Sequence, residues 1–321
     1  MWYTLCAEGD ESNAQGSIER ITTAGVITSY PLPDATSACA QGPLTLGPNG
    51  NVWFTTSPNL LGTVYQLGSI GVNGTIAEYA LPSGDAPLSL VAGSDGNLWY
   101  YTLLYSGTTV TGAAIRGFSL TTHSIFANIS TSVTNGVNLV PNPGDGTIVT
   151  VGGSTVYHFL PGPAPSLAAE ATLPSGVSCG GGTAGNDGNL YFQCTQSQSS
   201  VLVAIAQQTY AITVYPEQVS GTGVTPSLSY FAPVAFQAGA LYVNGSQTGG
   251  GIYNNVVGVL ATSGSLIAYF DLNNDLSDTF FDVAPGPNGS TWVAAQDHTG
   301  DPYLLQIGAV TAPASTRRRP R

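Results

Sequence analysis

The chain has 321 residues, of which 42% are hydrophobic and only 7% are charged. This composition is too apolar and too rich in aromatic residues for a disordered protein. The formal net charge of -12 argues against nucleic acid as a partner, because phosphate binding needs basic side chains. No apolar run approaches the roughly 18 residues of a membrane-spanning helix, so we expect no membrane span.

The basic residues are concentrated at the C-terminus. The sequence contains no lysine, and four of its six arginines lie in RRRPR, residues 317–321, which we expect to be a disordered tail. Residues 1–316, which we expect to form a single domain, carry 18 acidic side chains against two basic ones, Arg20 and Arg116. An acidic, lysine-free surface suits an exported protein, although a compositional bias of the source genome explains it equally well.

A turn followed by an aromatic strand recurs along the chain. GPNGNVWFTT begins at Gly47, and the related stretches GSDGNLWYYT, GNDGNLYFQC and GPNGSTWVAA begin at Gly93, Gly185 and Gly286. Asn-Gly and Asp-Gly between apolar runs indicate hairpins, because these residues accept positive φ. Alignment on the residue after the turn gives seven marker positions, 42 to 51 residues apart: Trp2, Trp53, Trp99, Val149, Tyr191, Tyr242 and Trp292.

The same four elements surround most of these markers. An apolar inner strand precedes the turn, near Leu44, Leu88, Val137, Gly181, Pro233 and Val283. A third strand follows the marker strand in GSIERIT (16–22), GTVYQLG (62–68) and AAIRGFSL (113–120), and a fourth in VITSYPLP (26–33), TIAEYALP (75–82) and AITVYPE (211–217). This pattern predicts an all-β, seven-bladed β-propeller of four-stranded antiparallel blades.

The first blade departs from the pattern, because no inner strand precedes the marker Trp2. We therefore expect this blade to lack its innermost strand in this chain. The opening residues MWYTLCAEGDE have neither the basic start nor the apolar core of a signal peptide. We expect a missing upstream segment to supply both the strand and an export signal, with a strand from another segment as the alternative. An export signal predicts an extracellular or periplasmic protein.

The four cysteines fit this register. Cys179 opens an inner strand and Cys194 closes the marker strand of the same hairpin, while Cys6 and Cys39 hold the equivalent positions on neighbouring blades. We predict the disulfides Cys179–Cys194 and Cys6–Cys39, which an oxidising compartment favours. Buried free thiols are the alternative.

The repeat resembles that of the virginiamycin B lyase (streptogramin lyase) family, in the stretches Gly47–Thr56, Gly16–Thr22, Val26–Pro33 and Gly74–Pro82. The resemblance implies a seven-bladed propeller. In the family's enzymes it also implies bound magnesium and the opening of a cyclic depsipeptide by elimination, with histidines near the inner strands and glutamates ending the marker strands. Here no glutamate ends a readable marker strand, and His123, His158 and His298 lie outside the inner strands. We therefore predict that the lyase residues are absent.

The remaining acidic residues suggest a binding face. The loops after the marker strands and after the fourth strands share one face, which carries most of the acids, Asp85 among them. A negative face attracts metal ions or cationic ligands. The loops that close the ring bring together a candidate binding or divalent-cation site: Glu8, Asp10, Asp297, His298 and Asp301. The alternative is that acidic residues merely favour solvated loops.

A second candidate metal site lies in DLNNDLSDTFFD, residues 271–282. Asp271, Asn273, Asp275 and Asp282 have the spacing of calcium ligands at positions 1, 3, 5 and 12 of an EF-hand loop. Leu276 replaces the glycine of that loop and no helices flank it, so the alternatives are a looser calcium loop or a plain polar one.

Several aromatic residues near loops are candidates for stacking on sugar rings, although such residues in propellers more often pack between blades: Tyr100, Tyr101, Tyr105, Tyr230 and Phe231. Together these observations predict a secreted, non-catalytic propeller whose acidic loop face binds a ligand, a glycan or a partner protein. The first alternative is a divergent, metal-dependent lyase that uses Mg or Ca. The second is a structural subunit of an extracellular assembly.

Overall fold

A computed structural model of the chain contains 26 β-strands and no helix within its described residues. Those residues are 1–5, 16–22, 24–33, 40–56, 64–131, 138–197, 199–216, 227–249, 252–264, 266–271, 279–286, 289–296 and 302–308. No described helix, therefore, is long and apolar enough to cross a membrane.

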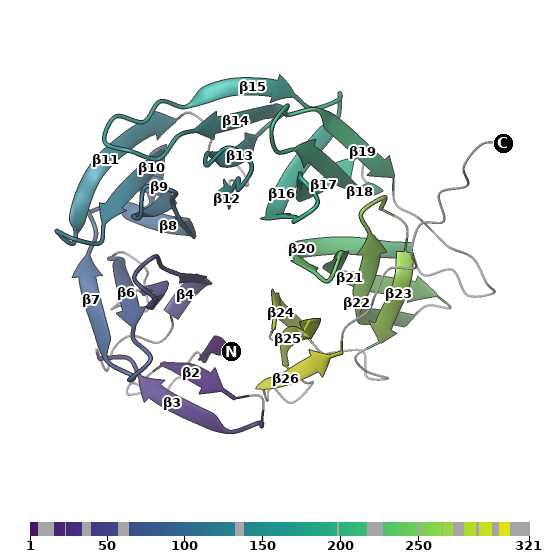
Figure 1. Cartoon of the computed structure of the whole chain (residues 1–321), viewed down its shortest axis with the longest axis horizontal. Coiled ribbons are helices and arrows are strands. Elements are labelled where there is room, and N and C mark those ends of the chain that lie inside the picture. The colour runs from purple at the N-terminus through teal and green to yellow at the C-terminus, as the bar shows by residue number, and fades with distance from the viewer. Residues whose placement is uncertain are drawn as a thin grey trace. The chain divides into compact units, whose positions relative to one another are not determined.

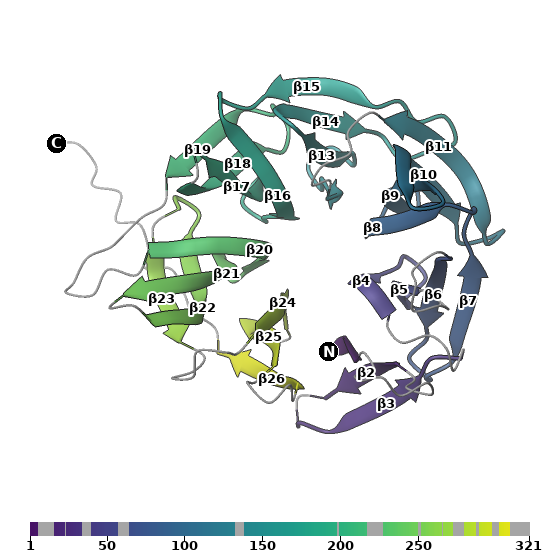
Figure 2. The ribbon, with the colours of Figure 1, turned by 180° about the vertical axis from the view of Figure 1, so that it is seen from behind.

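The strands form seven antiparallel sheets that follow one another along the chain, four of them in the unit Met1–Thr172 (Figures 1 and 2). In each sheet the strands are neighbours in chain order. The four sheets of this unit contain β1 (Trp2–Leu5), β2 (Ser17–Ile21) and β3 (Ile27–Pro31); β4 (Ala40–Leu46), β5 (Val52–Thr56), β6 (Gln66–Ile70) and β7 (Ile76–Ala80); β8 (Asp85–Ala92), β9 (Leu98–Ser106), β10 (Thr109–Ser119) and β11 (Ser124–Thr131); β12 (Val140–Pro141), β13 (Ile148–Gly152), β14 (Thr155–Phe159) and β15 (Ala168–Thr172).

The second unit, Leu173–Arg321, holds the other three sheets. They contain β16 (Val177–Ala184), β17 (Asn189–Gln196), β18 (Ser199–Ala206) and β19 (Ile212–Pro216); β20 (Ser227–Gln237), β21 (Ala240–Gly249), β22 (Ile252–Ala261) and β23 (Leu266–Asp271); β24 (Thr279–Pro285), β25 (Thr291–Gln296) and β26 (Pro302–Ile307).

The predicted seven-bladed β-propeller is confirmed, and so is a first blade that has three strands and begins with the marker strand β1. Three details differ from the sequence prediction. The last blade has three strands in its described part, the third strand of the second blade begins at Gln66 instead of Gly62, and the described inner strand of the fourth blade is β12, after Val137.

The recurrent turn is explained by its contacts with the marker side chain. The indole N–H of Trp53 donates to Asn49 Oδ1 over 3.1 Å, that of Trp99 donates to Asp95 Oδ1 over 3.2 Å, and the Tyr191 hydroxyl donates to Asp187 Oδ2 over 2.5 Å. The glycine after each Asn or Asp has positive φ, as at Gly50 with 79°. The turn side chain thus satisfies the polar group of a buried aromatic residue.

This geometry predicts how the second blade tolerates substitution at Asn49. Asn49→Asp should change the free energy of unfolding little, because Asp95 and Asp187 already play the same part in other blades. Asn49→Ala should cost about 1 kcal/mol, since the buried indole N–H loses its acceptor. Chemical denaturation of the two variants checks this; equal stability of both would contradict the proposed role of the turn.

The marker side chains also join consecutive blades. Trp53 contacts Phe118 of the next blade with ring centroids 5.8 Å apart, and Trp99 contacts Phe159 at 5.0 Å. In the second unit, Tyr191 stacks on Phe236 at 6.0 Å. In these three blades the marker residue is therefore buried against the following blade.

The inner strands carry a feature that the sequence analysis did not predict. In five blades the pairing between inner strand and marker strand contains a bulge, at Gln41/Thr45, Pro87/Ser89, Cys179/Gly182, Phe231/Val234 and Phe280/Asp282. A bulge leaves an extra residue unpaired and re-aims its side chain. In β8 this residue is Leu88, which is 47% exposed although it lies on an inner strand.

Candidate functional site

The predicted binding and metal residues are largely outside the part of the chain that the structure describes. This applies to Glu8, Asp10, Asp297, His298 and Asp301, and also to Asn273 and Asp275. Asp271 ends β23 and Asp282 lies in β24, but their side chains are not described. Within the described residues, no three His, Cys, Asp or Glu side chains are grouped so that they could hold a metal ion. Both sites stay predictions.

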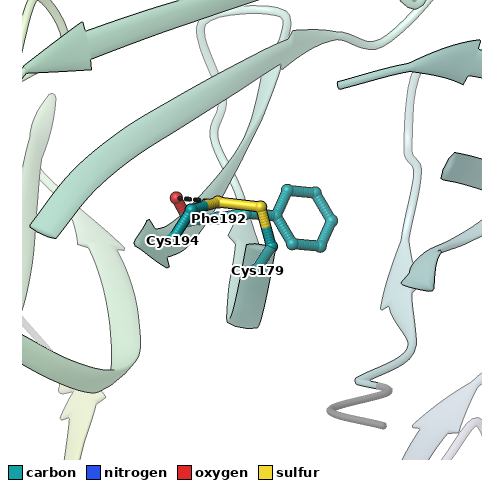
Figure 3. The surroundings of a disulfide bond; sticks show 3 residues. All are labelled: Cys179, Phe192 and Cys194. Carbon is teal, nitrogen blue, oxygen red and sulfur yellow. Dashed lines mark hydrogen bonds between the residues drawn. A yellow bond between two sulfur atoms is a disulfide. The ribbon is translucent and has the colours of Figure 1, made fainter. Parts of the chain in front are cut away.

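The Cys179–Cys194 disulfide is present (Figure 3). It joins the inner strand β16 to the marker strand β17 at directly paired positions, beside the bulge in β16. Both cysteines are buried, and Cys194 Sγ lies 3.6 Å from the carbonyl oxygen of Phe192. The pairing follows from the register of the hairpin, as the sequence predicted. Cys6 and Cys39 lie outside the described residues.

The best-defined charged site is a buried network in the third blade. Arg116 on β10 is aligned with Tyr100 on β9 and Asn128 on β11. Its guanidinium contacts the Asp85 carboxylate twice, with Nε 2.7 Å from Oδ2 and Nη2 2.8 Å from Oδ1. Nη1 donates to Asn128 Oδ1 over 3.2 Å. The Asp85 side chain is fully buried and that of Arg116 is 17% exposed, so each charge depends on the other for solvation.

Tyr100 completes this network from the marker strand. Its hydroxyl donates to Asp85 Oδ2 over 2.8 Å. Burial, followed by the Asp85 charge and this hydrogen bond, raises the pKa of the Tyr100 hydroxyl. The network corrects one prediction: Asp85 does not contribute to an exposed acidic face, because it is buried and neutralised by Arg116.

The first blade has a simpler version of the same arrangement. Tyr3, like Tyr100, follows its marker tryptophan and donates to an acidic side chain, here Glu19 Oε2 at 2.5 Å. Glu19 is buried and also accepts a hydrogen bond from Ser17 Oγ. Burial and then the Glu19 contact raise the pKa of the Tyr3 hydroxyl. Glu19 and Asp85 are thus both buried carboxylates stabilised by a tyrosine.

The other basic side chain of residues 1–316, Arg20, is also used internally. Its Nη1 donates to the Val72 carbonyl oxygen in the second blade over 3.1 Å. Its guanidinium carbon lies 5.6 Å from the centroid of the Trp2 ring, which is a cation–π contact. Both basic side chains that precede the tail are therefore engaged within the fold: Arg20 links the first two blades, and Arg116 is paired inside the third blade.

The positions three residues after the marker, where the family resemblance implies glutamates, are buried and carry no carboxylate in four blades. They are Thr56, Thr102, Cys194 and Ala295. Thr102 Oγ1 accepts the backbone N–H of Ala86 over 2.8 Å and so fastens the inner strand beside its bulge. In the fifth blade Cys194 occupies the position that Thr102 has in the third blade, and there the disulfide joins the marker strand to the inner strand.

The two described histidines lie away from the inner strands. His123 occupies the turn between β10 and β11 with φ of 52°, and its ring stacks on Tyr79 at 4.5 Å. His158 lies in the third strand of its blade, β14, with Nε2 3.6 Å from Glu170 Oε2. His298 lies outside the described residues.

The packing of aromatic residues between blades, weighed against stacking on sugars, is what the structure shows for two of them. Tyr100 and Tyr101 are fully buried, one and two positions after the marker Trp99. Tyr105, nearer the end of β9, is exposed. Tyr230 and Phe231 lie in β20, and their side chains are not described.

The sheets identify the protein as a β-propeller. Comparison with known proteins identifies the family to which the chain belongs. The sequence matches the Virginiamycin B lyase family over residues 1–301. The chain belongs to this family. Among curated proteins, no sequence matches it.

Solved structures with this fold include two lyases. Virginiamycin B lyase from Staphylococcus aureus is 18% identical with a TM-score of 0.63, and the match covers 96% of this chain and 99% of that one. A catalytically inactive histidine-to-alanine variant of the same enzyme, solved with quinupristin, matches over 97% and 100% with the same identity and TM-score. A streptogramin B lyase is 15% identical, with a TM-score of 0.62 and coverage of 95% and 98%. At these identities the likeness establishes the fold alone.

Proposed function

We propose that this protein is an extracellular ligand-binding propeller that lacks streptogramin lyase activity. The proposal rests on which residues lie three positions after the markers, where the family resemblance implies glutamates. Thr56, Thr102, Cys194 and Ala295 occupy these positions and are buried. General acid–base catalysis needs a titratable group within reach of the substrate, and none of these side chains supplies one.

The charges of the chain favour a neutral or cationic ligand. Arg20 and Arg116 are the only basic side chains before residue 317, and both are engaged within the fold. An anionic ligand would need an available cation and would be repelled by the excess of acidic groups. The predicted acidic loop face would instead attract a cationic ligand or a partner protein of opposite charge.

Two features support export. The Cys179–Cys194 disulfide fits an oxidising compartment. The chain has no lysine, so proteases that cleave at lysine find no site. Its many Ser, Thr and Asn side chains do not titrate, so their charge does not change with pH.

The second candidate function is a divergent, metal-dependent lyase whose site uses His298 with Glu8, Asp10, Asp297 and Asp301. The full-length fold match with lyases favours it. Thermal unfolding with EDTA and then with excess magnesium, calcium or manganese separates the two functions. A metal that binds only the folded state at a hundred times its Kd adds about 2.7 kcal/mol of stability.

The proposed function predicts no stabilisation that depends on His298 and Asp301. A metal-induced rise in Tm that disappears in the His298→Ala, Asp301→Ala variant would instead support the lyase. A rise that disappears only in the Asp271→Ala, Asp275→Ala variant would identify a structural calcium loop, which is compatible with a binding propeller.

A further inference from the structure

The third blade extends a hairpin beyond its inner strand. β9 has nine residues and β10 has 11, whereas the corresponding strands β13 and β14 of the next blade have five each. The inner strand β8 begins at Asp85, opposite Leu104, so the hairpin continues past it as a two-stranded ribbon. The ribbon is held at its base, where the Tyr105 N–H donates to Gly84 O over 2.8 Å and Thr111 Oγ1 donates to Leu104 O over 3.1 Å.

This ribbon presents an aromatic ring and apolar groups to solvent. Tyr105 and Val110 are cross-strand partners, which places their side chains on one face. They are 37% and 41% exposed. A second phenol, Tyr65 of the second blade, lies near enough for Tyr105 to raise its pKa, after the larger effect of burial. The exposed ring of Tyr105, beside the exposed Val110, offers a flat apolar surface on which a ligand can stack.

The chemistry of the ribbon is neutral and rich in hydroxyl groups. Its sequence from Leu103 to Gly112, LLYSGTTVTG, has no charged residue although the chain carries 18 acidic ones. At the base of the ribbon, the charges of Asp85 and Arg116 cancel in their ion pair, and the Asp85 side chain is fully buried. Apart from Val110, the other exposed side chains of the ribbon carry hydroxyl groups: Ser106 and Thr109, which pair on the face opposite Tyr105, and Thr108 and Thr111.

We propose that the end of the β9–β10 hairpin binds neutral polysaccharide, with Tyr105 as the ring on which a sugar stacks. A sugar offers an apolar C–H face to the ring and hydroxyl groups to the hydroxyl-bearing side chains of the ribbon. An uncharged surface on a strongly acidic protein favours a neutral polymer over a polyanionic one, which the rest of the chain repels. This inference rests on the proposed function as a binding propeller and names its ligand class.

The test is retention of the pure, full-length protein on neutral and anionic polysaccharides. The neutral probes are amylose, β-1,3-glucan, mannan and cellulose; the anionic ones are polygalacturonate and chondroitin sulfate. We expect measurable affinity for at least one neutral probe, little changed between low and high salt. Tyr105→Ala should weaken it at least tenfold, and Tyr105→Phe, which keeps the ring, should weaken it less than threefold.

Leu160→Ala is the matched control, because Leu160 is 62% exposed in the neighbouring blade and should leave retention unchanged. Unchanged Tm in all three variants shows that they fold. Failure of the wild-type protein to bind any neutral probe, equal binding by Tyr105→Ala, or salt-sensitive binding confined to the anionic probes would each overturn the proposal. None of these results bears on lyase activity, so the proposed function is tested separately.

Discussion

Replacing Arg116 with alanine should lower the free energy of unfolding by about 3 kcal/mol. Removing one partner of a buried ion pair costs about 3–5 kcal/mol, because the other charge is left without solvation, and the 17% exposure of Arg116 places it at the lower end. The Asp85 carboxylate would keep only the Tyr100 hydroxyl as its partner among the contacts of this network. Chemical denaturation of the variant and the wild-type protein measures the effect.

Arg20→Ala is the matched control, since it removes the only other arginine before the tail. Arg20 interacts with a carbonyl oxygen and a tryptophan ring instead of a carboxylate, so its loss should cost about 1 kcal/mol. A double variant, Asp85→Leu with Arg116→Met, should recover much of the stability, because it leaves no buried charge. If Arg116→Ala costs no more than Arg20→Ala, the network is not an essential part of the third blade.

The second large effect is expected at the disulfide. The Cys179→Ala, Cys194→Ala variant should lose about 3 kcal/mol, because the bond closes a loop with a sequence separation of 15 residues. Alanine suits both positions, since they are buried. Thr102→Val is the matched control in the third blade, where a hydrogen bond has the same place in the register and should contribute about 1 kcal/mol. A double cysteine variant as stable as Thr102→Val would show that the disulfide contributes little.

The architecture could be predicted from the sequence because each blade repeats its own local signals. The Gly-x-Asn/Asp-Gly turn fixes a hairpin, and the side chain of its Asn or Asp reaches the marker residue four positions later. The register of one such hairpin also placed Cys179 opposite Cys194. These interactions are short in sequence, so the pattern of residues reveals them directly.

The third strand of the second blade shows why similarity between repeat sequences did not locate every strand correctly. GTVYQLG resembles GSIERIT, but the structure pairs Trp53 with Ser69 and Phe54 with Gly68. Gly68 is required there because a Cβ atom would lie 2.2 Å from the Phe54 ring. Relative to the match with GSIERIT the strand is shifted by three residues, which places a glycine under phenylalanine. No repeat pattern displays this packing constraint.

The charged network could not be predicted for a similar reason. Asp85 and Arg116 are 31 residues apart on strands that do not pair with each other, and no spacing rule connects them. The one available signal was scarcity, because Arg116 is one of two basic residues before the tail and a buried partner for it was to be expected. The burial of Tyr100 and Tyr101, in contrast, follows the repeat, because Phe54 and Thr55 hold the same positions after Trp53 and are also buried.

The central claim is that this member of the virginiamycin B lyase family binds a ligand without opening cyclic depsipeptides. The most direct test is incubation of the protein with quinupristin and magnesium, with the Staphylococcus aureus lyase as the positive control and the cyclic and linear forms separated by chromatography. We predict that the amount of linear product stays at the level of the enzyme-free control. Magnesium-dependent linearisation that is lost in the His298→Ala variant would contradict the claim and establish the lyase.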